Sequence, residues 1–287
     1  MVFSSCCPGC DATIIGGSML FLFLALKILE SEVGEKIPKW VKTTLKITTY
    51  MSGGGIICFA ILLGILERDA DLRAWAFSKL CASMTKSPAM NEARCNLLGN
   101  IKGTVVEFGT GPGTNFKCWS PPNGLNITTY IGVEPNKYFK PFIKQEKTLT
   151  KLSFEPMMLW EQGGSTIHDI FDSSVDAVVA THLLCSVGDD DVVDSILNEI
   201  SRILKRGGKF YFLEHVSAAD KTLMKFMQES LAPLFRIVGN GCQFKPIWRN
   251  LERFAKDKGL ELQLTHWNAP MSVPFLKPHI IGSITKL

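Results

Sequence analysis

The stretch that decides the fold is Thr104-Val105-Val106-Glu107-Phe108-Gly109-Thr110-Gly111-Pro112-Gly113-Thr114-Asn115. Its first half is a short β-branched run that ends in an acid, and its second half is a glycine-rich turn. Glycines let the backbone adopt positive φ and approach a ligand closely, and the free N–H groups at the next helix start favour an anionic group. Because dinucleotide-binding enzymes use a related loop, this stretch alone does not identify the ligand.

Alternating strands and helices follow the glycine-rich turn. They are a strand at 130–136, a buried strand at 174–181, a helix at 191–204 that Lys205-Arg206-Gly207-Gly208 closes as a C-cap, and a strand at 209–215. The strand at 130–136 carries Glu134 near its end, where a carboxylate can accept both ribose hydroxyls of an adenosine. This order predicts an α/β fold with a doubly wound, mainly parallel sheet and ligand sites at the carboxyl ends of the strands.

The order of these elements resembles the class I S-adenosylmethionine-dependent methyltransferases, and the finer pattern resembles a small membrane-bound family that S-methylates alkyl thiols. The matching stretches are Gly113-Thr114-Asn115-Phe116-Lys117, Glu134-Pro135-Asn136, Leu184-Cys185-Ser186-Val187, Phe210-Tyr211-Phe212-Leu213-Glu214-His215-Val216, Trp248 with Leu251-Glu252, Ala269-Pro270 and Pro278-His279-Ile280. They cover nearly all of 101–287. The resemblance implies a Rossmann-like fold, S-adenosylmethionine as cofactor and a small lipophilic thiol as methyl acceptor.

A cofactor site is expected around the glycine-rich turn. Glu107 is expected either to hold the amino-acid end of the donor or to order the loop, and Glu134 to bind ribose rather than lie as a solvated surface acid. The resemblance adds the cofactor-binding residues Gly109, Gly111, Gly113, Asn115, Pro135, Asn136, Gly164, Ser165 and Thr181. The site departs from the family where Pro112 offers no N–H, where Glu134 replaces a common Asp, and where Ser165 replaces an acid.

Two histidines are candidate bases for the implied reaction. Methyl transfer is an in-line displacement, in which positioning supplies much of the catalysis, and a base raises the thiolate fraction of a thiol that is mostly protonated at neutral pH. His215 is the first candidate, and the alternative is that it only bonds a loop backbone. His182 is the weaker candidate because it departs from the family pattern. His279 either lines the pocket or merely joins a strand to a turn.

Apolar residues at helical spacing between Leu223 and Phe235 are expected to form either a lid over the substrate or ordinary core. The nine cysteines lie at positions 6, 7, 10, 58, 81, 95, 118, 185 and 242, and their odd number and irregular spacing favour reduced thiols. Cys185 is expected to be a small buried hydrophobe. The cluster at 6–10 lacks a nearby His for a zinc site, and is either S-acylated or an unmodified terminus.

Two uncharged hydrophobic runs, at 12–26 and 47–66, precede the predicted domain. As a helix the first would reach roughly 22 Å, short of the roughly 30 Å of bilayer hydrocarbon. A cleaved signal peptide, two buried helices and a membrane anchor are the alternatives. No Lys or Arg precedes Lys27, which disfavours a signal peptide, and a self-sufficient domain rarely buries two such runs. The sequence therefore favours a hydrophobic N-terminal helical anchor.

The expected organisation is a membrane-anchoring segment at 1–70, an amphipathic helical linker at 71–100 and the methyltransferase domain at 101–287. In the linker, one face holds Leu72, Trp75, Ala76, Lys79 and Leu80, and such a stripe more often packs on its own domain than on lipid. Lysines between the hydrophobic runs favour a cytosolic connection, and a hairpin or single span would keep the domain cytosolic. The resemblance implies the endoplasmic reticulum or lipid droplets. Asn126-Ile127-Thr128 is a glycosylation acceptor whose use would exclude the cytosol.

Composition restricts the classes of binding partner that the protein is expected to have. The net charge of +4, without a basic cluster, disfavours nucleic acid, and no obligate protein partner or metal site is expected. Two rival functions remain open: a lipid or quinone C- or O-methyltransferase that uses the same cofactor site, and a non-catalytic membrane or lipid-droplet scaffold. A nicotinamide oxidoreductase fits the elements around Gly207-Gly208 less well.

Overall fold

The computed structural model describes residues 43, 47, 54, 60–84, 87–160, 167–271 and 273–287. The chain divides into two units, Met1–Asp69 and Ala70–Leu287. In the first unit residues 60–68 are helical, and the hydrophobic run at 12–26 lies outside the described residues. In the part of the chain that the structure describes, no helix combines the length and the apolar composition needed to cross a bilayer.

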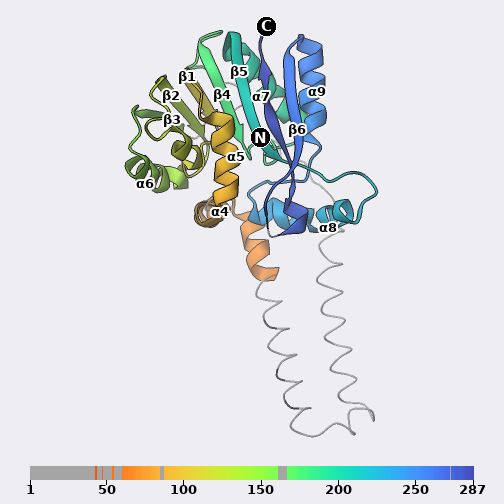
Figure 1. Cartoon of the computed structure of the whole chain (residues 1–287). Helices are drawn as coiled ribbons and strands as arrows, with labels where there is room; N and C mark the ends of the chain where they lie inside the picture. Colours follow the sequence, from red (N-terminus) through yellow and green to blue (C-terminus); the bar gives the residue numbers. More distant parts are fainter. Residues whose placement is uncertain are drawn as a thin grey trace. The chain divides into compact units, whose positions relative to one another are not determined.

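A seven-stranded sheet forms the centre of the second unit (Figure 1). Its strands are β1 (Gly103–Phe108), β2 (Ile127–Glu134), β3 (Pro156–Trp160), β4 (Val175–Thr181), β5 (Leu204–His215), β6 (Glu261–Asn268) and β7 (Pro278–Thr285). They lie in the order β3-β2-β1-β4-β5-β7-β6, and only β7 runs antiparallel to its neighbours. The prediction of a Rossmann-like α/β fold with a mainly parallel sheet is confirmed.

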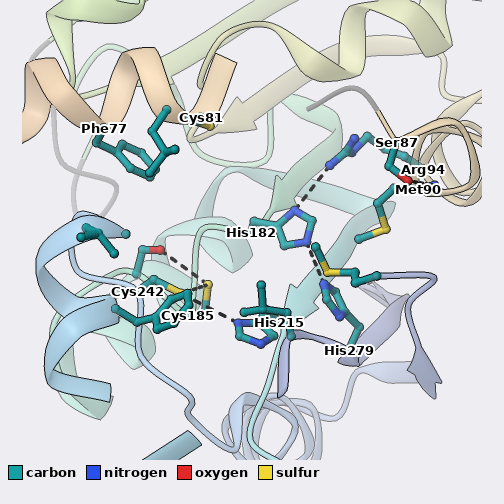
Figure 2. A pocket seen from close by; sticks show the side chains of 17 residues that line it. Phe77, Cys81, Ser87, Met90, Arg94, His182, Cys185, His215, Cys242 and His279 are labelled. Atoms are coloured by element: carbon teal, nitrogen blue, oxygen red, sulfur yellow. Dashed lines mark hydrogen bonds between the residues drawn. The ribbon is translucent and has the colours of Figure 1, made fainter. Parts of the chain in front are cut away.

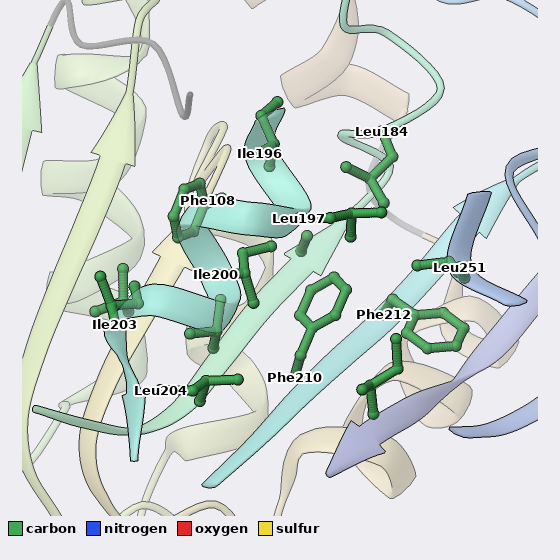
Figure 3. Packing of buried hydrophobic residues seen from close by; sticks show 14 of the residues in the cluster. Phe108, Leu184, Ile196, Leu197, Ile200, Ile203, Leu204, Phe210, Phe212 and Leu251 are labelled. Atoms are coloured by element: carbon green, nitrogen blue, oxygen red, sulfur yellow. The ribbon is translucent and has the colours of Figure 1, made fainter. Parts of the chain in front are cut away.

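Helices cover both faces of this sheet (Figure 1). They are α4 (Ala70–Met84), α5 (Pro88–Leu98), α6 (Lys140–Thr150), α7 (Asp190–Ile203), α8 (Leu223–Val238) and α9 (Ile247–Lys258), with short 3₁₀ turns η1 (Thr114–Trp119), η2 (Lys137–Phe139) and η3 (Pro274–Leu276). Successive strand residues point to opposite faces. Val106 and Val178 therefore join the cluster beneath α7 and α9, whereas Val105 and Val179 join the one beneath α5, η1 and α6. Figure 3 shows apolar side chains of α7 next to Phe210 of β5, and Phe212 next to Leu251 of α9.

The segment Lys205–Gly208 is a strand bulge, and its prediction as a helix C-cap is wrong. Helix α7 ends at Ile203, and its C-cap residue Leu204 is already extended, with φ −66° and ψ 134°. The pairing of β5 with β4 steps from Leu204 to Lys209, so the intervening residues bulge out of the ladder. Gly207 has φ 76°, and its N–H donates to the Lys286 carbonyl at 2.6 Å. The paired glycines serve this bulge rather than a helix end.

The predicted linker consists of two helices, because a new helix starts at Pro88 with Ser87 as its N-cap. Helix α4 packs through Phe77, Ser78 and Cys81, which face the core. The predicted packing stripe is wrong for Trp75 and Leu80, which are 46% and 42% exposed. The face of α4 that packs on the domain is therefore adjacent to the face that the apolar spacing predicts, and not identical to it.

A disulfide joins Cys95 of α5 to Cys118 of η1. The prediction of reduced thiols is wrong for these two cysteines, because α5 packs along η1 and brings together residues whose spacing gives no signal. Cys81, Cys185 and Cys242 are free thiols, and Cys185 is buried as predicted.

Candidate functional site

Two cavities lie at the carboxyl ends of β1, β2, β4 and β5, where the strand order reverses and α/β sheets bind ligands. The loop cavity, of about 230 Å³, is bounded by the glycine-rich turn at 109–112, Glu134-Pro135-Asn136 and Thr181. The histidine cavity, of about 260 Å³, is bounded by three histidines and three cysteines among mainly apolar side chains (Figure 2). Five residues line both: Phe77, Cys81, Arg94, His182 and Ser186.

Glu134 ties the end of β2 to the glycine-rich turn. Its Oε2 accepts the Gly111 N–H at 2.7 Å and its Oε1 accepts the Asn136 N–H at 2.8 Å. The side chain is buried, and burial raises its pKa to about 7 although both N–H donors lower it. Each carboxylate oxygen has a second lone pair and Glu134 lines the loop cavity, so a vicinal diol such as ribose fits this carboxylate.

A second buried carboxylate, Glu107, lies behind the loop. Its Oε1 accepts Asn115 Nδ2 at 2.6 Å, and its Oε2 accepts the Tyr130 hydroxyl. Asn115 Nδ2 also donates to Thr181 Oγ1 at 3.1 Å, which links the loop to the end of β4. Burial raises the pKa of Glu107 to about 7. Glu107 does not line the loop cavity, so the geometry favours its ordering the loop over its holding a ligand.

The glycines of the turn need positive φ, with 70° at Gly109, 57° at Gly111 and 84° at Gly113. A Cβ on Gly111 would meet only the Gly109 carbonyl, at 4.0 Å, so it would project into open space of the cavity wall. A Cβ on Gly109 would lie 2.9 Å from Leu183 Cδ1. The turn thus leaves a cradle that any side chain would fill.

The predicted site residues divide between the cavities. The loop cavity is lined by Gly109, Gly111, Glu134, Pro135, Asn136, Thr181 and His182. The residues Glu107, Gly113 and Asn115 do not line it, and His215 and His279 line the histidine cavity. Gly164 and Ser165 lie outside the described residues.

Arg94, which no sequence motif indicates, lies on α5 in the walls of both cavities. It is 5% exposed, and its Nη1 donates to Asn91 Oδ1 at 3.2 Å. Its Nε is buried without a hydrogen-bond partner, and no carboxylate of the described residues lies within ion-pair distance of the guanidinium. Burial lowers its pKa. The Glu107 carboxylate is near enough to raise the pKa of Arg94 but does not pair with it. A buried cation beside a cavity without a paired acid fits a ligand with a carboxylate.

His182 joins Arg94 to His279 in a hydrogen-bonded chain (Figure 2). Arg94 Nη2 lies 3.4 Å from His182 Nδ1, His182 Nε2 lies 3.0 Å from His279 Nε2, and His279 Nδ1 lies 3.1 Å from the Lys277 carbonyl. Since a guanidinium only donates and a carbonyl only accepts, His279 carries its proton on Nδ1 and His182 on Nε2. Both nitrogens of His182 are thereby engaged, and burial lowers its pKa well below the ordinary value.

His215, in contrast, has a ring nitrogen that is not engaged. Its Nδ1 lies 3.8 Å from Cys242 Sγ, and its Nε2 is buried and makes no hydrogen bond to the part of the chain that the structure describes. Burial lowers its pKa to about 4, although the nearby Phe275 backbone carbonyl acts in the opposite direction, so the imidazole is neutral at pH 7. A neutral imidazole with an unused nitrogen in an apolar cavity can accept a proton from a bound acid.

Glu214 is a further buried acid that the sequence does not single out as a site residue. Its carboxylate accepts the N–H groups of Leu183 at 3.0 Å, Leu184 at 3.0 Å and Cys185 at 3.3 Å. These bonds hold the loop after β4, which carries His182 and Cys185 into the cavities. The sequence signals for this role are the position of Glu214 near the end of the predicted strand at 209–215 and its place in a stretch that resembles the family.

Known proteins with similar sequences are methyltransferases. Residues 106–212 match a family model described as a methyltransferase domain. Thiol S-methyltransferase TMT1A of Homo sapiens is 37% identical over 187 residues, covering 64% of this chain and 71% of that protein. Thiol S-methyltransferase TMT1B of Rattus norvegicus is 33% identical over 189 residues, covering 64% of this chain and 70% of that protein.

The fold is also found in solved structures at low identity. The YcgJ protein of Bacillus subtilis superposes with a TM-score of 0.53 at 14% identity, covering 69% of this chain and 97% of that chain. The predicted cofactor, S-adenosylmethionine, is confirmed. The chain belongs to the family of thiol S-methyltransferases and is an S-adenosylmethionine-dependent methyltransferase.

Proposed function

We propose that this protein methylates a small lipophilic alkyl thiol, with S-adenosylmethionine in the loop cavity and the thiol in the histidine cavity. The shared wall of the two cavities, with Arg94 and His182 at its centre, carries this proposal, because groups bound on either side meet there. Apolar side chains fit a lipophilic acceptor; they include Met90, Phe235, Val238, Met271 and Leu276. The names of the similar thiol S-methyltransferases support sulfur as the accepting atom.

The residues of the loop cavity match the parts of the cofactor. The Glu134 carboxylate would accept the ribose hydroxyls, and the cradle at Gly111 would admit the chain of the amino-acid moiety. The Arg94 guanidinium would pair with the carboxylate of that moiety, which supplies the acid that the buried cation lacks. Glu107 and Asn115 act behind the loop as positioning residues. When bound, S-adenosylmethionine supplies an electrophilic methyl group on a sulfonium.

His215 is the group we assign to the acceptor proton. Its Nε2 has no hydrogen-bond partner among the described residues, and His215 lines the histidine cavity, whereas both nitrogens of His182 are engaged. A thiol has a pKa of about 8.5, and a base with a pKa of about 4 removes its proton only with electrostatic help. When bound, the cationic sulfonium of the cofactor would supply that help by favouring a nearby thiolate.

We further propose that residues 1–70 attach the protein to the membrane of the endoplasmic reticulum or of lipid droplets. Exposed apolar side chains on α4 and α8, two helices in contact, support a lipid-facing surface: Trp75 is 46%, Leu80 42%, Leu223 75% and Phe226 66% exposed. Leu80 also lines the histidine cavity, so a lipophilic acceptor could enter from the lipid side.

We propose that the domain lies on the cytosolic face, where the methyl donor is made. The Cys95–Cys118 disulfide is the observation that opposes this placement, because disulfides are more usual in the lumen than in the cytosol. Asn126 is exposed, so a glycan at this residue in the native protein would contradict the cytosolic placement.

An acceptor comparison tests the proposed function. The full-length protein, solubilised in detergent, is incubated with S-adenosylmethionine and either an alkyl thiol or the alcohol of equal chain length, and products are identified by mass spectrometry. We expect the methyl thioether from the thiol and no ether from the alcohol. Methylation of an alcohol, phenol or quinol without methylation of any thiol would favour the oxygen- or carbon-methyltransferase. A well-folded protein that does not bind S-adenosylmethionine would favour the non-catalytic scaffold function.

A further inference from the structure

Two free cysteines lie next to each other in the wall of the histidine cavity (Figure 2). The Sγ atoms of Cys185 and Cys242 are 3.8 Å apart, although the residues lie 57 positions apart in sequence. Cys185 belongs to the loop after β4, and Cys242 to the turn that follows α8. The methyl transfer that we propose uses neither sulfur.

The backbone holds these two segments together independently of the sulfurs. The Gln243 N–H donates to the Cys185 carbonyl at 2.8 Å, and the Cys185 N–H donates to Glu214. Gly241, with φ 101°, lets the turn approach so closely that a Cβ there would lie 2.5 Å from the Ser186 carbonyl oxygen. A disulfide needs its sulfurs about 2.05 Å apart, so closure requires the two sulfurs, now 3.8 Å apart, to move toward each other.

The two thiols are not equivalent. The hydrogen bond between the sulfurs lowers the pKa of the Cys242 thiol, and it raises the pKa of Cys185 together with burial. Cys242 is also the more exposed of the two, and its sulfur lies 3.8 Å from His215 Nδ1. A thiolate attacks and a thiol resolves in dithiol chemistry, so Cys242 suits the attacking role and Cys185 the resolving role.

We propose that Cys185 and Cys242 form a redox-active dithiol that closes to a disulfide when a hydroperoxide enters the acceptor cavity. The Cys242 thiolate attacks the distal peroxide oxygen, the O–O bond breaks, and Cys242 becomes a sulfenic acid while the peroxide leaves as alcohol or water. The Cys185 thiol then displaces that oxygen as water and forms the S–S bond. Two thiols are oxidised and one peroxide is reduced; a small dithiol reverses the change by exchange.

Closure alters the cavity where the acceptor would be activated. It draws the Cys242 sulfur toward Cys185 and removes the S–H group beside His215. Methyl transfer to a thiol is therefore expected to fall on oxidation and to recover on reduction. This consequence for turnover rests on the proposed function, whereas the formation of the disulfide does not.

The test maps disulfides in the full-length protein, in detergent, after graded hydrogen peroxide. Free thiols are blocked with N-ethylmaleimide, and unreduced peptides are analysed by mass spectrometry. We expect a peptide that links Cys185 to Cys242 to appear with rising peroxide and to vanish after dithiothreitol. The Cys95–Cys118 link serves as an internal standard for detection.

Matched variants show whether the linked peptide depends on these two cysteines. Cys242→Ser and Cys185→Ala, each checked for folding by circular dichroism, should abolish the linked peptide. Cys81→Ser should retain it, because burial raises the pKa of Cys81 to about 11 and keeps that residue a thiol. If wild-type Cys185 and Cys242 stay fully alkylated, or if Cys242 proceeds to sulfinic acid without a link, the dithiol proposal is wrong. Neither result would bear on methyl transfer by the reduced protein.

Discussion

The Glu134 carboxylate accepts the backbone N–H of Gly111 at 2.7 Å, which fixes the end of β2 against the turn after β1. The same carboxylate lines the loop cavity and is buried, so one side chain shapes the turn and presents charge to a ligand. Its pKa of about 7 makes both properties sensitive to pH near neutrality.

Binding of S-adenosylmethionine should tighten as the pH rises through about 7, because the ionised Glu134 accepts two hydroxyls better than the acid does. Titration calorimetry at pH 6, 7 and 8 measures this dependence. Glu134→Gln should remove it, and Glu261→Gln, at an exposed acid, should keep it. An unchanged pH dependence in Glu134→Gln would rule out Glu134 as the titrating group.

The contribution of Glu134 to the free energy of unfolding should fall as the pH rises, in contrast to cofactor binding. The folded protein holds the Glu134 proton more tightly than the unfolded chain, so this contribution is present at low pH and is lost between about 4.5 and 7. The difference in unfolding free energy between wild type and Glu134→Gln isolates it from Glu107, whose pKa is raised in the same window. Urea unfolding of the ligand-free proteins at pH 5 and pH 8 gives this difference. A wild-type advantage that grows with pH would contradict the assignment.

Arg94→Met should weaken S-adenosylmethionine binding by about 10- to 100-fold, since a charge-assisted hydrogen bond contributes about 1.5–3 kcal/mol. The ligand-free variant should be no less stable than wild type, because Arg94 is a buried cation without a carboxylate partner. Thermal unfolding with and without the cofactor measures both effects. Arg249→Ala, at an exposed residue, is the control. Equal cofactor-induced shifts in Arg94→Met and wild type would exclude the carboxylate pairing.

His215→Asn should lower kcat for the thiol by about 10²- to 10⁴-fold, the usual contribution of a positioned base. Its affinity for S-adenosylmethionine should not change, because His215 lines only the histidine cavity. Steady-state kinetics and calorimetry separate the two quantities. The exposed His168→Asn should match wild type in both. A variant with full kcat would remove His215 from the mechanism.

Phe210→Ala should cost about 3–5 kcal/mol of unfolding free energy, because Phe210 is fully buried between β5 and α7 (Figure 3). Phe171→Ala, at a side chain that is 82% exposed, should stay within about 0.5 kcal/mol of wild type. Urea denaturation gives both values. Similar losses in the two variants would contradict this packing.

The strands around the site were predictable because their signals are local. A β-branched run ending at Glu107 or near Glu134 carries its own boundary, and parallel pairing then brings those ends to one edge. The prediction of a C-cap at Gly207-Gly208 was wrong for the same reason. A local pattern that is typical of a C-cap is also typical of a bulge, and the hydrogen-bond partner of this bulge, Lys286, lies far along the chain.

The rest of the site depends on tertiary packing. Arg94 faces both cavities only because α5 packs along η1, and its helix carries no motif. Cys242 meets Cys185 through the turn after α8, at a separation that no spacing rule connects. His182 departs from the family pattern, yet its φ of 56° and its bonds to Arg94 and His279 place it between the cavities.

The most direct test of the central claim is a calorimetric titration of S-adenosylmethionine into the detergent-solubilised full-length protein and into Glu134→Ala. The claim is that the cavity between Glu134 and Arg94 holds the methyl donor. We predict micromolar binding with one site in wild type and no detectable binding in a folded Glu134→Ala. Absence of binding in well-folded wild type, or equal affinity in the variant, would contradict the account.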